Sequence, residues 1–214
     1  MLKFPYGISD FYTIRTEGYV YIDRTDRIAL VEEAGKHLVF LRPRRFGKSL
    51  WLSTLENYYD VAKAGEFAQL FGDLAIGRNP TPRHNSYFIL RWDFSLISAQ
   101  GGIAEIGQAV HAHINARIQG FAETYREQLA YPITVHPTNA IASFESLLTA
   151  VRATDYRLYL LIDEYDNFAN EVLMSRAPPE SPPVGRDIGV KGAGSGMGLD
   201  RPSPLASRQL CSAT

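Results

Sequence analysis

The sequence predicts an α/β fold in which a parallel sheet is covered by helices on both faces. Three short apolar runs, at 37–41, 87–94 and 158–162, have the length and the branched or aromatic content of buried strands. Helical patterns separate these runs, and strands that alternate with helices form parallel sheets. The chain of 214 residues is 45% hydrophobic and 21% charged, close to the globular average, which excludes wholesale disorder.

Capping residues and spacing predict the elements before the second run. Asp23 is suited to cap a helix over about 24–34, and Gly35 ends that helix. The run 37–41 follows as the first strand, because it is continuously apolar and lies between a glycine and a proline. A second helix is predicted from Lys48 to Tyr59, since its apolar residues share one face.

Two further helices are predicted between the second and third strands. The first carries an apolar stripe about seven turns long. Its members are Ile103, Ile106, Val110, Ile114, Ile118, Phe121, Tyr125 and Leu129. A shorter stripe predicts the second helix over about 141–151, with Thr138 or Asn139 as its N-cap.

Residues 177–214 differ in composition from the rest of the chain. They contain no aromatic residue, although aromatic residues make up 12% of the chain, and they hold six of the 12 prolines. Such a segment cannot bury enough apolar surface to offset the entropy of ordering it. We expect residues 1–175 to form the domain and residues 176–214 a disordered tail. The abrupt break favours a tail that is not native to the fold over a native linker.

Charge and cysteine content exclude several function classes. With 22 basic and 23 acidic residues the net charge is −1, which excludes binding driven by overall positive charge but not a local basic patch. The single cysteine, Cys211, excludes an internal disulfide and a zinc site built from several cysteines. No apolar run reaches the roughly 18 residues of a membrane helix, and no secretory signal is visible. We expect a cytoplasmic protein without membrane contact.

A basic loop leads from the first predicted strand into the helix that begins at Lys48. Such a loop binds phosphates, because the N–H groups of a helix N-terminus point towards the anion. In the pattern G-x-x-x-x-G-K-[ST] the lysine reaches the β- and γ-phosphates and the hydroxyl binds Mg²⁺. Gly47, Lys48 and Ser49 match this pattern, whereas Arg42 replaces the first glycine. The candidate nucleotide-binding residues are Arg42, Pro43, Arg44, Arg45, Phe46, Gly47, Lys48, Ser49 and Leu50. The alternative is a basic turn on the surface.

An acidic pair follows the third predicted strand. Asp163 and Glu164 stand at the carboxyl end of that strand, where ligands bind in parallel sheets. Asp163 would hold Mg²⁺ together with Ser49, and Glu164 would orient and deprotonate the attacking water. The alternative is a strand that ends in a solvated acidic turn. Asp93, at the end of the second run, either supports the metal or is a turn residue.

Three segments together resemble the bacterial predicted AAA-ATPase (AAA-ATPase-like) family. They are Tyr21-Ile22-Asp23-Arg24-Thr25, Leu41-Arg42-Pro43-Arg44-Arg45-Phe46-Gly47-Lys48-Ser49 and Leu161-Ile162-Asp163-Glu164-Tyr165-Asp166. The resemblance runs from about Phe4 to Ser175. It implies a three-layer α/β/α P-loop NTPase fold that uses ATP and Mg²⁺, with 87–94 as a strand inserted between the Walker A and Walker B strands. It also implies that arginine at the first Walker A position is usual.

The same resemblance implies that the sheet is incomplete. In P-loop folds of this type a strand that follows Walker B lies between the Walker A and Walker B strands, and here the match stops about a dozen residues past Glu164. Without that strand, either its two neighbours pair directly or the chain is a low-activity fragment. Members often carry a C-terminal nuclease-like domain of the PD-(D/E)XK type, which nothing in 177–214 matches.

The sequence therefore predicts an ATP-binding domain that hydrolyses ATP with Mg²⁺ when the fold is complete. Lys48 and the loop amides would stabilise charge, and Glu164 would act as the base. One alternative is a non-catalytic nucleotide-binding or interaction module. Another is a nucleic-acid-associated protein that uses Arg42, Arg44 and Arg45 on phosphates.

Overall fold

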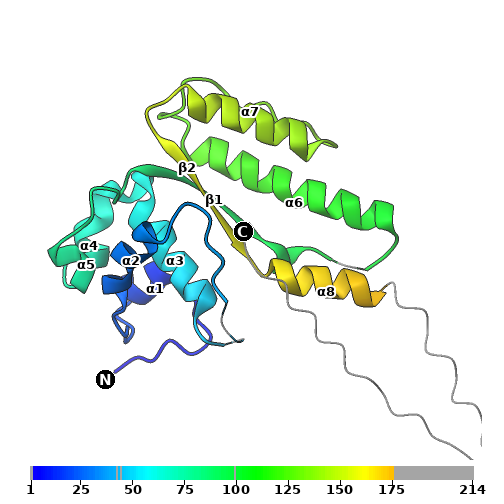
Figure 1. Ribbon diagram of the computed structural model, residues 1–214. Coiled ribbons are helices and arrows are strands. Elements are labelled where there is room, and N and C mark those ends of the chain that lie inside the picture. Colours follow the sequence, from blue (N-terminus) through cyan, green and yellow to red (C-terminus); the bar gives the residue numbers. More distant parts are fainter. Residues whose placement is uncertain (1, 42, 44, 99, 176–214) are drawn as a thin grey trace, which may run out of the picture. The chain divides into compact units, whose positions relative to one another are not determined.

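A computed structural model describes residues 2–41, 43, 45–98 and 100–175, all within one unit of the chain (Figure 1). The predicted tail, 176–214, lies outside the described residues. In chain order the elements are α1 (Phe11–Thr16), η1 (Thr25–Arg27), α2 (Ile28–Glu33), α3 (Lys48–Tyr59), η2 (Val61–Glu66), α4 (Phe67–Phe71), α5 (Ala75–Arg78), β1 (Tyr87–Asp93), η3 (Phe94–Leu96), α6 (Ile103–Thr124), α7 (Ala140–Arg152), β2 (Arg157–Asp163) and α8 (Tyr165–Ser175), where η denotes a 3₁₀ helix.

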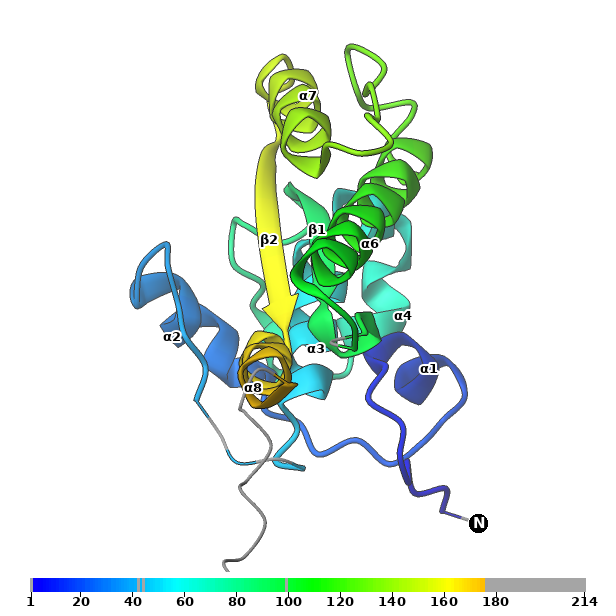
Figure 2. The same ribbon diagram turned by 90° about the vertical axis from the view of Figure 1, so that its right-hand side faces the viewer.

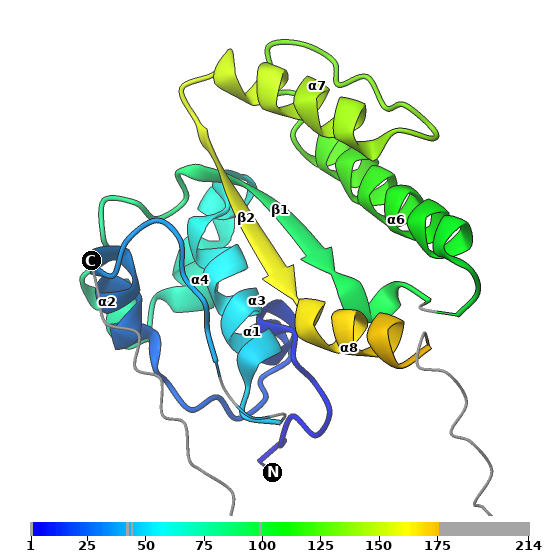
Figure 3. The same cartoon turned by 45° about the vertical axis from the view of Figure 1, so that its right-hand side comes forward.

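The sheet consists of two strands among the described residues. β1 pairs with β2 in parallel, in a register that runs from Tyr87 opposite Arg157 to Asp93 opposite Asp163. The second and third predicted strands are thereby confirmed, and so is their parallel direction. Figure 3 shows the two strands side by side, with α8 beginning where β2 ends.

Helices cover both faces of this small sheet. Alternate side chains of a strand point to opposite sides, and both strands carry apolar side chains on each side that pack against helices. Ile89 and Leu161 are buried in a core cluster with Leu55 of α3. Phe88 and Leu90 are buried in a second cluster against α6 and α7. In Figure 1, α6 and α7 accordingly lie on one side of the strands and α1 to α5 on the other.

The predicted helices are confirmed where their signals are local. α3 spans Lys48 to Tyr59, as predicted from its apolar face. α7 has Asn139 as its N-cap, since the Asn139 side chain accepts a hydrogen bond from the backbone N–H of Ala142 at 3.1 Å. α6 follows the long apolar stripe but ends at Thr124, and Tyr125 of the stripe is buried just beyond it.

The predicted helix over 24–34 forms as two shorter pieces, η1 and α2. The predicted N-cap role of Asp23 is wrong, because the N-cap of η1 is Arg24 and no side chain caps that helix. One oxygen of the Asp23 carboxylate instead accepts from both the N–H and the hydroxyl of Thr25, the first residue of η1. The other oxygen accepts from the N–H of Ala75 at the start of α5. Asp23 thus joins two segments about fifty residues apart and does not cap the helix as expected.

The predicted first strand is wrong. Residues 37–41 belong to no strand, and Val39 and Leu41 are 70% and 81% exposed. In Figures 2 and 3 this segment, which follows α2, passes on the side of β2 away from β1. An apolar run becomes a strand only where another strand offers backbone partners, and no described residues supply one between this segment and β2.

Candidate functional site

The N-terminus of α3 has the backbone geometry of an anion site. Gly47 is its N-cap, with φ of +77°, and no side chain caps the helix. An added Cβ at Gly47 would meet nothing within 4 Å, so glycine is favoured there by its backbone conformation rather than by crowding. Arg45 is also left-handed, with φ of +65°. Left-handed residues in such a loop turn successive N–H groups towards a bound anion, and the helix dipole adds to the attraction.

The side chains of the loop are accessible where they are described. Pro43, Arg45 and Phe46 are exposed, while Lys48, Ser49 and Leu50 are half-buried. The predictions for Arg42 and Arg44 lie outside the described residues. The nucleic-acid role considered for the loop arginines therefore stays a prediction.

The two residues of the acidic pair after β2 differ in burial. Asp163 is only 4% exposed, and Glu164 is half-buried. Glu164 has φ of +56°, which costs a non-glycine residue about 1–2 kcal/mol. Its carbonyl accepts from the N–H of Phe168 at 3.3 Å, so this strained residue turns the chain directly into α8.

Arg91 of β1 links the helix after the loop to the acidic strand end. Its Nη1 donates to Oε2 of Glu56 on α3 at 3.0 Å, and its Nη2 donates to Oδ2 of Asp163 at 3.2 Å. Burial raises the pKa of the Glu56 carboxyl, and the positive charge of Arg91 acts in the opposite direction. Sequence reasoning missed Arg91, although an arginine inside an otherwise apolar buried strand is itself a signal, because such a charge needs a carboxylate partner.

Among the described residues, few side chains near the acidic pair could bind Mg²⁺. No group of three or more His, Cys, Asp or Glu residues comes together in this part of the chain. Mg²⁺ bound with a nucleotide needs only one or two carboxylates besides phosphate and water ligands, so the oxygen donors of Asp163 and Ser49 are of a suitable type, while Oδ2 of Asp163 is paired with Arg91. Asp93 is engaged elsewhere, since its carboxylate accepts from the N–H of Ser95 at 3.0 Å and from the Ser95 hydroxyl at 2.6 Å. Asp93 is the turn residue of the two alternatives.

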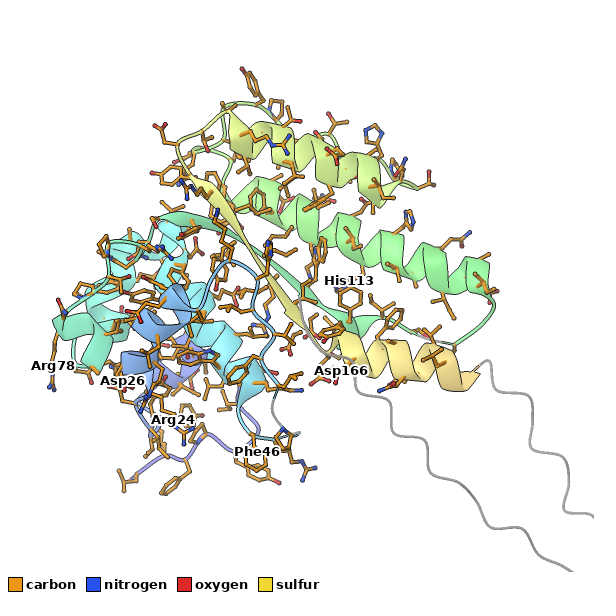
Figure 4. The ribbon with its side chains drawn as sticks, viewed as in Figure 1. Arg24, Asp26, Phe46, Arg78, His113 and Asp166 are labelled. Carbon is orange, nitrogen blue, oxygen red and sulfur yellow. The ribbon has the colours of Figure 1, made fainter. Side chains whose placement is uncertain are left out.

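A mostly apolar cavity of about 640 Å³ adjoins the loop. It lies between the segment around Tyr21 and Ile22 and the first turns of α3, where Gly47 and Trp51 line it. Arg24 and Phe46, both labelled in Figure 4, also line the cavity. No sequence signal pointed to this cavity, because its walls come from segments that only the fold brings together.

Two comparisons show which known proteins the chain is similar to. The family model described as Predicted AAA-ATPase matches residues 5–180. A curated protein of Azotobacter chroococcum mcd 1, described as "Uncharacterized protein in vnfD 5'region", is 33% identical over 177 residues, which cover 77% of this chain. The chain spans 29% of that relative's length.

No solved structure matches the chain. Among the described residues, no helix is both long enough and apolar enough to cross a bilayer. The family match covers the basic loop, both strands and the acidic pair, and it agrees with the resemblance carried by the three sequence segments. The chain belongs to the predicted AAA-ATPase family.

Proposed function

We propose that the chain binds ATP with Mg²⁺ at the N-terminus of α3 and, in a P-loop fold, hydrolyses it. The observation that carries this proposal is the connection between the start of α3 and the acidic pair after β2. α3 begins at Lys48 directly after left-handed Gly47, and Glu56 on the same helix is joined through Arg91 to Asp163. Membership of a family described as Predicted AAA-ATPase supports the nucleotide class.

Each residue of the proposed site has a separate task. The N–H groups of the first turn of α3 hold the phosphates, and Lys48 adds a positive charge where negative charge develops. Ser49 and Asp163 would hold Mg²⁺, which when bound neutralises phosphate charge. Glu164, which is half-buried and follows Asp163 directly in the sequence, orients the water and accepts its proton. We place this activity in the cytoplasm.

Replacement of Lys48 by alanine tests the assignment of the loop. Removal of a charged phosphate contact worth roughly 1.5–3 kcal/mol should weaken ATP binding about ten- to a hundredfold. Isothermal titration calorimetry measures the affinity. Lys36→Ala is the matched control, because Lys36 is an exposed lysine outside the loop. Equal ATP affinity in Lys48→Ala and the parent chain would show that the phosphates do not bind here.

We propose further that the nucleoside of ATP enters the apolar cavity beside the loop. Gly47 belongs both to the proposed phosphate site and to the cavity wall, so the two are continuous. Half-buried Trp51 offers an aromatic surface to a base, which stacking stabilises by about 1–3 kcal/mol. The volume of about 640 Å³ lies within the range of small-molecule sites.

Ile22→Glu tests this placement. Ile22 lines the cavity and is 75% exposed, so the substitution should leave the fold intact while it opposes an apolar base. We expect ATP affinity to fall at least about tenfold, and affinity for inorganic tripolyphosphate to stay unchanged. Ile141→Glu is the control, because Ile141 on α7 is 71% exposed and does not line the cavity. A parallel loss for ATP and tripolyphosphate would place the base elsewhere.

A further inference from the structure

The ion pair between Arg91 and Asp163 implies more than a structural link. We propose that Arg91 is an internal counter-ion for Asp163, which keeps Mg²⁺ from binding to the nucleotide-free chain, so that the metal enters only with the phosphates. This inference rests on the proposed function in one respect, that Asp163 is the metal ligand. It adds an order of binding that the loop and the acidic pair do not imply by themselves.

The first support is the burial of Asp163. Its side chain is 5% exposed, and its Oδ2 accepts from Nη2 of Arg91 at 3.2 Å. A carboxylate removed from water is strongly unfavourable unless a positive charge or hydrogen bonds compensate it. Arg91 is the cation that pairs with Asp163 among the described residues. In the absence of metal, Arg91 therefore supplies the charge that the carboxylate needs.

The second support is the other partner of Arg91. Its Nη1 bonds to Oε2 of Glu56 at 3.0 Å, from the opposite branch of the same guanidinium. If the Asp163 carboxylate turns to a metal, Arg91 keeps an anionic partner and is not left as an unpaired, partly buried cation. Exchange of one cation for another at Asp163 is thus possible without expelling Arg91 from the site.

The electrostatic balance then determines when the metal binds. Mg²⁺ alone would meet a guanidinium already paired with its carboxylate ligand, and two like charges within a few ångströms repel each other. A nucleotide brings several negative charges at the N-terminus of α3, which offset that repulsion. We therefore expect affinity for bare Mg²⁺ to be low and affinity for the Mg²⁺–nucleotide complex to be high.

The test measures the response of Arg91→Met to MgCl₂ without nucleotide. The variant should unfold at a lower temperature than the parent chain in EDTA, because Asp163 has lost its counter-ion. MgCl₂ should then raise its melting temperature, by about 3–6 °C at ten times the dissociation constant. The parent chain should not respond at the same concentration, and Arg91→Lys, which keeps the charge, should behave like the parent.

Two controls assign the response to Asp163. The double variant Arg91→Met/Asp163→Asn should lose the Mg²⁺ response, since both charges are gone. Arg15→Met removes another arginine that pairs with a carboxylate, Asp73, away from Asp163, and it should gain no response. A folded Arg91→Met chain that ignores Mg²⁺, or a double variant that still responds, would overturn the proposal.

Calorimetry of MgCl₂ against the parent chain keeps the proposal testable should Arg91→Met fail to fold. We expect no binding heat at millimolar Mg²⁺, and measurable binding to the bare parent chain would contradict the proposed order. Because none of these titrations contains nucleotide, their outcome is separate from the ATP affinities of the Lys48→Ala comparison. Failure of one proposal can thus be distinguished from failure of the other.

Discussion

A strand added beside the outer edge of β2 should raise ATP turnover about a hundredfold. Among the described residues no strand pairs with that edge, and the segment 37–41 on the same side belongs to no strand. On the α7-facing side of β2, Leu160 and Ile162 are 37% and 41% exposed. Among the described residues, the loop before α3 and the acidic pair after β2 therefore share no sheet that would fix their separation. Phosphoryl transfer depends on positioning, and an error of about 1 Å can reduce the rate about a hundredfold.

The experiment compares three chains in a steady-state ATPase assay. The first is the 214-residue chain, which we expect to turn over slowly even if it binds ATP. The second ends at Ser175 and should match the first in stability and nucleotide affinity. The third extends the domain with the segment that follows Walker B in a longer family member, and it should show the gain. The same extension with a proline at the centre of the added strand is the control, because proline removes a ladder hydrogen bond. Rapid turnover by the 214-residue chain alone would show that the site needs no further strand.

Local signals predicted the elements that the structure confirms. α3 and the cap of α7 follow from residues adjacent in the sequence, such as Asn139 and the apolar face that ends at Tyr59. β1 follows from its aromatic and branched residues, and β2 follows from a continuous apolar run. In each case the information needed lies within the element itself.

The failed strand depended on a distant partner. Residues 37–41 have the composition of a buried strand, yet Val39 and Leu41 are exposed. A strand at this place needs backbone partners from another part of a chain, which its own sequence cannot supply. The same local run would be predicted as a strand whether or not that partner exists.

The candidate site likewise contains residues that a local motif predicts and residues that only the fold brings together. Gly47 and Lys48 could be placed from the sequence, because a glycine that precedes a helix and its lysine form a local motif. The bridge from Glu56 through Arg91 to Asp163 joins three elements and could not be placed. Arg91 can be recognised in the sequence as a charged residue within a buried strand. The sequence does not show which carboxylates pair with it.

Glu164→Gln should retain ATP binding and lose hydrolysis by a factor of about 10²–10⁴, the usual contribution of a general base. Glutamine keeps the size of the side chain but cannot accept a proton from water. It also keeps the backbone demand at this position, where φ is +56°, so the loss would report chemistry rather than conformation. The measurement is steady-state turnover in the chain with the added strand, with ATP affinity from calorimetry.

A second substitution separates the strain at Glu164 from its chemistry. Glu164→Gly removes the unfavourable left-handed conformation of a non-glycine residue, and it should raise the free energy of unfolding by about 1 kcal/mol. It should nevertheless lose hydrolysis as fully as Glu164→Gln, because it has no carboxylate. Asp166→Asn is the matched control, since Asp166 is an exposed carboxylate in the first turn of α8 and should retain turnover. Parent-like turnover in Glu164→Gln would assign the proton transfer to another group. Loss of ATP binding in Glu164→Gly would show that the bent backbone shapes the nucleotide site itself.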